Sequence, residues 1–499
     1  MSPWWTNAVI YQVYLRSFAD SDGDGIGDLD GVRSRLPYLH DLGVDGIWLT
    51  PFYTSPMNDG GYDITDHRDV DPVFGTLADF DALLADAHAL NLRIIIDLVP
   101  NHTSDTHPWF HSHDRRKRYI FRPGRDGGPP NDWESVFGGP AWSPAPDGDD
   151  WYLHLFDATQ PDLDWHNPEV ADEYADILRY WLDRGVDGVR IDVAHGLFKA
   201  DGLPDVGYAG QDHRLDVLPF FDQDGVHDVY RRWRKILDSY PGDRIGVAEA
   251  WAPTADRLAL YTRPDELHQA FNFPFLLAPW QAPAVRAVVD RSLAAGSSPT
   301  WVLSNHDVQR HRTRLGSAAR AQAATLFMLA LPGSAYLYQG EELGLPEVLD
   351  LPDEALQDPT FSRSDGADRG RDGCRIPLPW TAQAPAFGFS QTGRPWLPMP
   401  ADWAELSVQA QQRRTDSTLA LYRHALRLRR SFAGELAWHD APEGVLVFSR
   451  SSLTCTTNFS DRDIAITAPG SPVLSSAPLP PIRDDGAVLI PKETCVWWQ

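Results

Sequence analysis

Short apolar runs alternate with longer amphipathic stretches from the start of the chain. The short runs are rich in β-branched residues, as in LRIIIDLV at 92–99 and GVRIDVA at 188–194, and each predicts a buried strand. The longer stretches predict helices, and this alternation favours βα units around a parallel sheet. The predicted strands cover residues 9–15, 46–51, 92–99, 188–194, 244–250, 300–306 and 334–340. They supply seven of the eight strands that a closed (β/α)8 barrel needs.

Helix signals lie between these strands. Residues 76–90 begin with Thr76 and Asp79 in the spacing of a capping box. The segment GVDGI at 43–47 recurs as GVDGV at 185–189, where each glycine predicts a turn out of a helix and the apolar residues enter the sheet. The recurrence indicates repeated βα units. Further predicted helices cover residues 170–184 and 418–430.

Two long segments interrupt the alternation. Residues 103–168 are rich in Gly, Pro, Trp, Asp and His, and no plain βα loop is that long, so we expect an inserted, loop-rich domain B after the third strand. Residues 347–403 also have turn composition and are expected to wall the same end of the barrel. Short strands and turns near the end of the chain predict a small antiparallel module.

The predicted architecture is therefore an α/β fold, a (β/α)8 TIM barrel with an inserted loop-rich domain and a C-terminal antiparallel β domain. The predicted boundaries are 1–102 and 169–433 for the catalytic barrel, 103–168 for domain B and 434–499 for a C-terminal β-sandwich.

Charge and cysteine content narrow the range of partners and compartments. The chain has 44 Lys and Arg against 70 Asp and Glu, a formal net charge of −26 at pH 7, and a field of that sign repels nucleic acid and anionic membranes. Three scattered cysteines are too few for a disulfide framework or a four-thiolate metal site, which favours a reducing compartment. The N-terminal sequence lacks the apolar core of a secretory signal, so we expect a cytoplasmic protein, a monomer or a small homo-oligomer.

Acidic residues recur at the ends of the predicted strands. Asp97, Asp192 and Glu249 come directly after apolar runs, and Asp307 follows VLSNH. In a parallel βα barrel the carboxyl ends of the strands share one mouth, so these side chains should converge in space. The structural alternative is a core salt bridge between Asp192 and Arg190, which lies two residues earlier on the same strand face.

Four segments resemble the signature regions of the α-amylase superfamily of retaining glycoside hydrolases. They are DLVPNH (97–102), GVRIDVAH (188–195), GVAEAW (246–251) and SNHD (304–307), in order and at strand ends. The resemblance implies that Asp192 is the nucleophile, Glu249 the general acid/base, and Asp307 the carboxylate that stabilises the distorted sugar. Retention of configuration requires the first two carboxyls about 5 Å apart. Arg190 is expected to keep Asp192 ionised.

The resemblance also implies a set of residues that hold the non-reducing sugar. Carboxylate and guanidinium groups bind adjacent hydroxyls, histidine donates to a ring hydroxyl, and tyrosine stacks on a sugar face. The alternative for the tyrosine and histidines is a packing role in the core. The predicted substrate-binding residues are Tyr62, Asp63, His102, Arg190, His306 and Arg310.

A calcium-loop spacing occurs near the first strand, in DSDGDGIGD. Gly31 stands where an EF-hand has its terminal glutamate, so Asp28 must complete the site. The loop resembles one in the oligosaccharide α-glucosidase branch of the family, which implies one structural divalent cation, Ca²⁺ or else Mg²⁺; a solvated turn without metal is the alternative. No organic cofactor is expected. The predicted ligands are Asp20, Asp22, Asp24, Asp28 and the carbonyl of Ile26.

Further segments resemble exo-acting α-glucosidases and oligo-1,6-glucosidases, among them QPDLDWHNPEV (160–170) and GRDGCRIPLPW (370–380). Endo-amylases tend to carry Lys-His where this chain has His195 and Gly196. Val193 resembles the oligo-1,6-glucosidases whereas Ala194 departs from them, so the linkage stays open.

The expected function is a retaining exo-α-glucosidase that hydrolyses short oligosaccharides of the maltose or isomaltose type through a glucosyl ester on Asp192, with transglucosylation as a side reaction. One alternative is a glucosyltransferase or isomerase acting on sucrose, maltose or trehalose. Another is a non-catalytic scaffold, which the three retained carboxylates disfavour. A zinc hydrolase is a third, because four histidines cluster in the sequence: His102, His107, His111 and His113.

Overall fold

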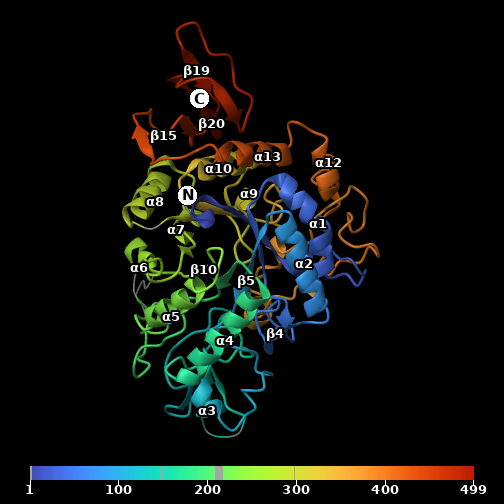
Figure 1. The fold of residues 1–499 in the computed structure, drawn as a ribbon, viewed down its shortest axis with the longest axis vertical. Coiled ribbons are helices and arrows are strands. Elements are labelled where there is room, and N and C mark those ends of the chain that lie inside the picture. Colours follow the sequence, from blue (N-terminus) through green and yellow to red (C-terminus); the bar gives the residue numbers. More distant parts are fainter. Residues whose placement is uncertain (1–2, 147, 149, 208–216, 297) are drawn as a thin grey trace.

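The computed structural model describes residues 3–146, 148, 150–207, 217–296 and 298–499. Its centre is a ring of eight parallel strands (Figure 1), and in this ring each strand pairs with its neighbours along the chain, while β13 returns to β1. The predicted (β/α)8 barrel is confirmed. In chain order the strands are β1 (Val9–Val13), β2 (Gly46–Leu49), β5 (Arg93–Leu98), β9 (Gly188–Ile191), β10 (Ile245–Ala248), β11 (Gln269–Ala270), β12 (Thr300–Val302) and β13 (Ser334–Tyr338).

The eighth strand is β11, which the sequence pattern did not predict. It has two residues, and the ring closes beyond it through a parallel bridge between Phe271 and Thr300. The Asn272 amide donates to the Thr300 carbonyl at 3.0 Å. A strand of two residues is too short to display an alternation of apolar and polar positions, so only the closure of the ring identifies it.

The helices alternate with these strands as expected, and their ends follow the local sequence. In α2 the Thr76 side chain accepts from the Asp79 amide and the Asp79 carboxylate accepts from the Thr76 amide, which confirms the capping box. Gly43 and Gly185, from the repeated GVDG segments, both end helices with left-handed φ angles of 97° and 110°. The longer barrel helices are α1 (Leu29–Leu42), α2 (Leu77–Ala89), α4 (Pro168–Arg184), α5 (Val226–Asp238), α6 (Ala255–Leu260), α8 (Ala282–Ala294), α10 (Ala318–Ala330) and α13 (Thr418–Arg429).

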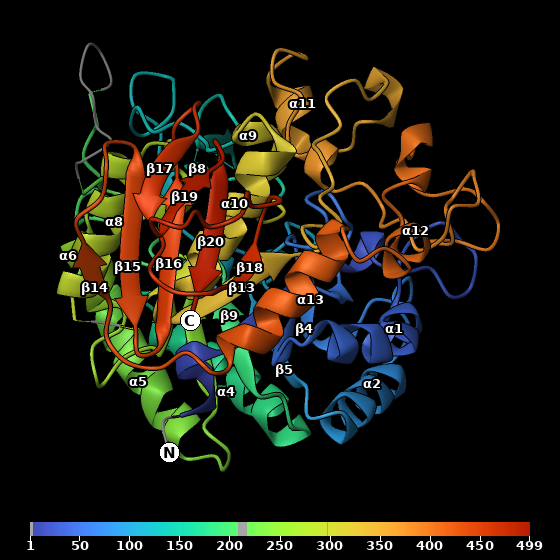
Figure 2. The same ribbon diagram turned by 90° about the horizontal axis from the view of Figure 1, so that it is seen from above.

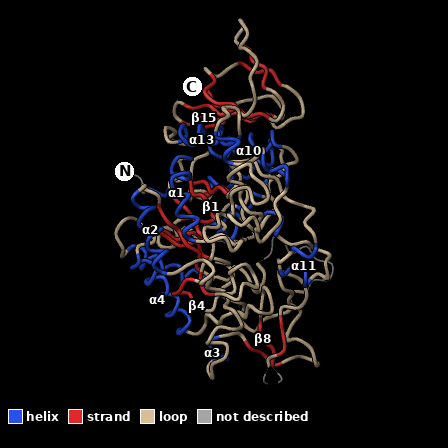
Figure 3. Tube along the Cα trace, turned by 90° about the vertical axis from the view of Figure 1, so that its right-hand side faces the viewer, coloured by secondary structure: helices blue, strands red, loops and turns tan. Residues whose placement is uncertain are grey.

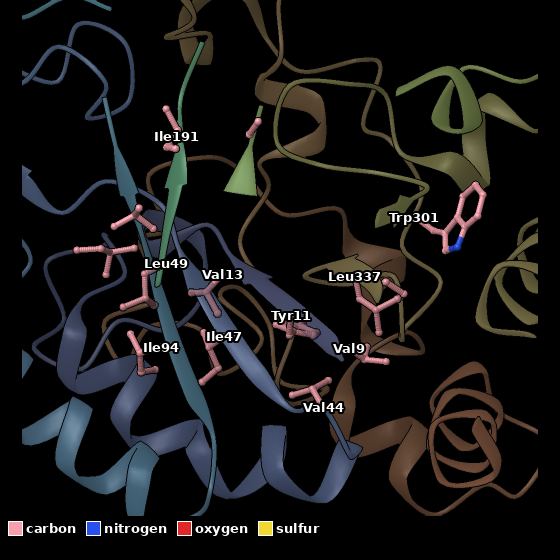
Figure 4. Close-up of a cluster of buried hydrophobic side chains, with 14 of the residues drawn as sticks. Val9, Tyr11, Val13, Val44, Ile47, Leu49, Ile94, Ile191, Trp301 and Leu337 are labelled. Carbon is pink, nitrogen blue, oxygen red and sulfur yellow. The ribbon is translucent and has the colours of Figure 1, made fainter. Parts of the chain in front are cut away.

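The strands bury both of their faces. Val9, Tyr11 and Val13 of β1 belong to the large cluster between the strands and the helices (Figure 4), whereas Ile10 and Trp48 belong to a separate cluster inside the ring. Continuous apolar runs are the sequence signature of strands covered on both sides. This double burial holds the strands rigidly and fixes where their carboxyl ends point.

Two irregular segments cover the carboxyl ends of the strands. The inserted segment after β5 contains a three-stranded antiparallel sheet and a single helical turn, and it lies at the end of the molecule opposite the C-terminus (Figures 1 and 3). The second segment contributes short helices between residues 347 and 403. These elements are α3 (Arg115–Arg118), β6 (Phe121–Pro123), β7 (Trp142–Pro144), β8 (Asp150–Leu153), η3 (Asp353–Ala355), α11 (Pro359–Arg363), η4 (Asp372–Cys374) and η5 (Ala401–Ala404). The remaining short elements are η1 (Trp4–Asn7), η2 (Leu15–Ser17), the β3 (Tyr53–Thr54) and β4 (Asp66–Val70) pair, α7 (Phe273–Leu276), α9 (His311–Arg314) and α12 (Val408–Gln412).

The C-terminal module is antiparallel throughout, as expected, and lies over α10 (Figure 2). The indole of Trp497 donates to the Leu326 carbonyl of α10 at 3.2 Å, and Arg450 donates to the Ala330 carbonyl at 3.0 Å. The described helices include none that is both long and apolar enough to cross a bilayer. The strands are β14 (Ala437–His439), β15 (Val445–Arg450), β16 (Leu453–Asn458), β18 (Pro472–Ser475) and β20 (Thr494–Trp498) in one sheet, and β17 (Ile464–Thr467) with β19 (Ala487–Ile490) in the other.

Candidate active site

A cavity of about 530 Å³ opens where the barrel strands end. It is lined by residues that lie in or follow β2, β5, β9, β10 and β12, and both irregular segments contribute to its wall. This is the place where a βα barrel collects functional side chains, because the strand ends converge there. The lining residues are Asp59, Tyr62, His102, Val136, Phe137, Phe156, Arg190, Asp192, Val193, His195, Phe221, Glu249, Trp251, His306, Asp307, Thr360, Asp368, Gly370 and Arg371.

The three predicted catalytic carboxylates all line this cavity. Asp192 and Glu249 follow β9 and β10, which are hydrogen-bonded neighbours, and each is 7% exposed. One guanidinium serves both: Nη1 of Arg190 donates to Oδ1 of Asp192 at 2.7 Å, and Nη2 lies 3.7 Å from Oε2 of Glu249. The salt bridge expected under the structural alternative is therefore present, but its carboxylate faces the cavity.

A strained turn fixes the Glu249 carboxylate. Val193 has a φ of 44°, which is costly for a β-branched residue, and its amide donates to Oε2 of Glu249 at 2.7 Å. The Ala194 amide donates to the Glu249 carbonyl at 2.8 Å. The turn after Asp192 is thus tied to both the backbone and the side chain of Glu249.

Burial determines the protonation of the carboxylates. It raises the pKa of Asp192 and of Glu249, and repulsion from nearby carboxylates adds to the rise while Arg190 opposes it. Burial alone would also raise the pKa of Asp307, but His306, Arg371 and Arg375 hold it below its ordinary value. Asp307 is therefore ionised near neutral pH.

The fourth acidic strand end, Asp97, does not line the cavity. It is fully buried and accepts from Arg190 at 2.8 Å, from the Trp48 indole at 3.1 Å and from the Tyr62 hydroxyl at 3.0 Å. Two of these donors, Arg190 and Tyr62, do line the cavity. Asp97 therefore fixes the orientation of Arg190 and Tyr62 without lining the cavity itself.

Four of the six predicted substrate-binding residues line the cavity, namely Tyr62, His102, Arg190 and His306. Tyr62 stacks on His306 with ring centroids 5.3 Å apart and an angle of 8°. The Gln12 amide donates to Nδ1 of His306 at 2.6 Å, which leaves Nε2 to donate to Oδ2 of Asp307, 3.2 Å away. Burial lowers the pKa of His306 well below its ordinary value, so the ring is neutral.

The structure places Asp63 and Arg310 outside the cavity lining. The Asp63 carboxylate accepts from the Ser55 hydroxyl and from the amides of Asn58 and Asp59, so it shapes the loop that carries Tyr62. Arg310 is buried and donates to backbone carbonyls of Gln339 and Cys374 at 2.8 and 2.7 Å. Both side chains are hydrogen-bonded within the protein, and their role in binding the sugar stays a prediction.

Asp59 and Arg371 are among the cavity residues that the sequence analysis missed. Arg371 forms ion pairs with Asp59 at 2.6 Å, with Asp307 at 2.9 Å and with Asp358 at 2.6 Å. Gln160 donates to Asp59 at 3.1 Å and lies 3.2 Å from Nε2 of His102. These contacts close the polar end of the cavity. Asp59 lies four residues before the predicted Asp63, and Arg371 lies in the segment 370–380 that resembles the α-glucosidases, so each lies beside a sequence signal.

A buried lysine attaches the inserted segment to the catalytic turn. Nζ of Lys199 lies 2.7 Å from Asp162 and 3.0 Å from the Asn101 side-chain oxygen, and it also donates to the Gly196 carbonyl. Lys199 and Asp162 are both buried, so each charge depends on the other. This contact holds the wall of the cavity against the turn that follows Asp192.

In the acidic loop at residues 20–28, three of the four aspartates lie close together. Ligand oxygens of Asp20, Asp22 and Asp28 lie within 4.8 Å of one another, whereas Asp24 is not part of that group and accepts from the Ile26 amide at 2.7 Å. None of these residues lines the cavity. The four histidines of the zinc alternative form no such group in the described part of the chain.

A parallel barrel that brings three carboxylates and a shared guanidinium into one cavity at its strand ends has the architecture of a barrel enzyme. The model of the alpha-amylase catalytic domain matches residues 12–435. The chain is 39% identical to a probable alpha-glucosidase of Rhizobium meliloti (strain 1021), covering 92% of this chain and 90% of that protein. It is 35% identical to the oligo-1,6-glucosidase of Parageobacillus thermoglucosidasius, over 92% and 91%. The chain belongs to the α-amylase family of glycoside hydrolases.

Solved structures agree with this assignment. An alpha-glucosyl transfer enzyme, XgtA, superposes with a TM-score of 0.90 at 38% identity, over 100% of this chain and 99% of that one. The trehalulose synthase MutB from Pseudomonas mesoacidophila MX-45 superposes with a TM-score of 0.91 at 29% identity, over 100% and 99%. The protein is therefore similar both to hydrolases and to enzymes that transfer or isomerise glucosides.

Proposed function

We propose that this enzyme is a retaining exo-α-glucosidase that removes terminal α-linked glucose from short oligosaccharides. The observation that carries the proposal is the position of Asp192 and Glu249 on adjacent strand ends, within reach of the same guanidinium, in a cavity whose inner end is closed by Arg371 and its carboxylates. A closed polar end suits a single terminal glucosyl unit. The relatives named as alpha-glucosidase and oligo-1,6-glucosidase support the same choice.

The chemistry follows from the different contacts of the two carboxyls. Arg190 donates directly to Asp192, which favours its ionised form, and it lies farther from Glu249, so that Glu249 is the carboxyl that carries the proton. Asp192 attacks the anomeric carbon and forms a glucosyl ester while Glu249 protonates the departing oxygen. Glu249, now ionised, takes a proton from water, whose oxygen displaces Asp192 and releases glucose. Asp307 is held ionised beside the sugar and stabilises the positive charge that develops on it.

Substitution of Asp192 tests this assignment. Asp192→Ala removes the nucleophile, and release of the chromophore from p-nitrophenyl α-glucoside should fall at least about 10⁴-fold, since no ester can form. Added azide should restore turnover and give β-glucosyl azide. Turnover of Asp192→Ala near the wild-type rate would overturn the proposal.

A glucosyl transferase or isomerase is the second candidate, because XgtA is named a transfer enzyme and MutB a trehalulose synthase. Hydrolysis, transfer and isomerisation all proceed through the same glucosyl ester, and they differ in the group that attacks it. Chromatography of the products from maltose, isomaltose, sucrose and trehalose separates the candidates: hydrolysis gives only the two monosaccharides of each substrate, whereas transfer or isomerisation gives new oligosaccharides.

The acidic loop is proposed to hold one structural divalent cation, Ca²⁺ or Mg²⁺. Three aspartate carboxylates within one ion's reach fit the oxygen ligands that both ions prefer. Thermal unfolding in chelator and after addition of each metal tests the site. We expect Asp22→Asn to abolish a metal-dependent rise in Tm; no rise in the wild type with either ion would contradict the proposal.

A further inference from the structure

Two of the three cysteines meet inside the C-terminal module, although they are 40 positions apart in the chain. The sulfurs of Cys455 on β16 and Cys495 on β20 lie 3.5 Å from each other, and both residues are fully buried. The third cysteine, Cys374, belongs to η4, where its Sγ lies 3.3 Å from the His306 carbonyl. The three thiols are scattered in the sequence, so the pair is a product of the fold.

The register of the two strands explains this approach. β16 and β20 are antiparallel neighbours in which Cys455 pairs with Trp497 and Thr457 pairs with Cys495. The two cysteines are therefore diagonal neighbours, and their side chains point to the same face of the sheet. That face packs on α10, where the Trp497 indole donates to the Leu326 carbonyl at 3.2 Å. The pair thus lies where the module meets the barrel.

The geometry suits a bond between the two sulfurs. A disulfide has an S–S length of about 2.05 Å, so the sulfurs need to approach by about 1.5 Å from their separation of 3.5 Å. Rotation about the Cα–Cβ bonds and a small shift of the strands supply that movement. Burial raises the pKa of Cys455, so this thiol stays protonated while the module is closed. Because the thiolate is the reactive form, the reaction requires a local opening of the module.

We propose that Cys455 and Cys495 are a modification site, a dithiol that an oxidised low-molecular-weight thiol such as glutathione disulfide converts into a disulfide, and that this bond fastens β20 to β16. In the first exchange, the thiolate of one cysteine attacks the small disulfide, forms a mixed disulfide and releases one reduced small thiol. The second cysteine then attacks the protein sulfur of the mixed disulfide, closes the protein disulfide and releases the second reduced small thiol. The protein loses two electrons and two protons, and the small disulfide gains them.

The bond should stabilise the attachment of the module without changing catalysis. It closes a loop of 40 positions that contains β17, β18 and β19, and closing such a loop restricts the unfolded chain. Because β20 is the last strand and contacts α10 through Trp497, the bond also resists separation of the module from the barrel. None of the described residues of the module lines the cavity, so kcat/KM should stay the same.

The test compares the purified enzyme after incubation with reduced and with oxidised glutathione. Incubation takes place in urea below the unfolding transition, which favours local opening, and the urea is removed before Tm is measured. We expect the oxidised protein to retain one of its three thiols, to be lighter by two hydrogen atoms, and to melt about 2–6 °C above the reduced protein. Cys455→Ala and Cys495→Ala should each abolish the rise in Tm. Cys374→Ser is the matched control, because it leaves the pair in place and should retain the rise.

Three outcomes would overturn the inference. One is the presence of all three thiols in the wild type after the oxidising incubation, or of bound glutathione in place of the internal bond. Another is a peptide map in which the bond involves Cys374 or joins two molecules. The last is a Cys455–Cys495 disulfide that leaves Tm unchanged, which would show that the bond does not fasten β20.

Discussion

Arg371 is the residue whose replacement should reveal most about the closed end of the cavity. Its guanidinium contacts Asp59, Asp307 and Asp358 at 2.6, 2.9 and 2.6 Å, and two of these carboxylates line the cavity. A hydrogen bond to a charged group contributes about 1.5–3 kcal/mol, and an unpaired buried charge adds to the loss. Losing the contacts to the two cavity carboxylates should therefore cost about 3–6 kcal/mol of transition-state stabilisation, a fall in kcat/KM of about 10²- to 10⁴-fold.

Arg371→Met is the variant to assay, with kcat/KM for p-nitrophenyl α-glucoside measured from pH 4 to 9. Arg371 helps to hold the pKa of Asp307 below its ordinary value, so its removal raises that pKa and should shift the acid limb of the profile to higher pH. Arg369→Met is the control, because Arg369 pairs with the exposed Asp353 and does not line the cavity. A kcat/KM for Arg371→Met within about threefold of wild type, or an unmoved acid limb, would refute the reasoning.

Two further predictions concern buried charges away from the reacting atoms. Burial raises the pKa of Glu341 from 4.5 to about 8 in the folded protein. The free energy of unfolding is therefore larger while Glu341 is protonated, and this gain is lost as the pH rises from about 4.5 through 8. Glu341→Gln should therefore raise Tm relative to wild type at pH 9 and have less effect at pH 5; an equal change at both values would contradict this. Lys199→Met should leave Asp162 as an uncompensated buried charge and cost about 3–5 kcal/mol of unfolding free energy by denaturant titration, whereas Lys235→Met, on the exposed face of α5, should cost little. A loss below about 1 kcal/mol for Lys199→Met would show that the pair is not structural.

The sequence predicted those parts of the fold and site that are encoded locally. Asp192 and Glu249 come directly after apolar strands, and a parallel barrel necessarily brings such positions together, so their convergence followed from the pattern alone. Strand β11 was not predicted, because two residues are too few to show an alternation of apolar and polar positions.

Contacts between distant segments were harder to foresee. Arg371 reaches Asp59 across 312 positions of the chain, and no local pattern reports such a pairing. Asp59 and Asp63 are acidic residues of one loop that look alike in the sequence. The structure distinguishes them, because Asp63 accepts hydrogen bonds from the Ser55 hydroxyl and two loop amides, whereas Asp59 lines the cavity. The same holds for Arg310, whose two terminal nitrogens donate to carbonyls from other segments.

The stereochemistry of the first product tests the central claim most directly. Proton NMR of p-nitrophenyl α-glucoside hydrolysis, recorded within the first minutes at high enzyme concentration, resolves the anomer of the released glucose before it mutarotates, because the departing group contributes no second glucose. Two displacements, by the carboxylate at position 192 and then by water, predict that α-glucose appears first and that the β form grows in later. Initial release of β-glucose would mean a single displacement and would contradict the account.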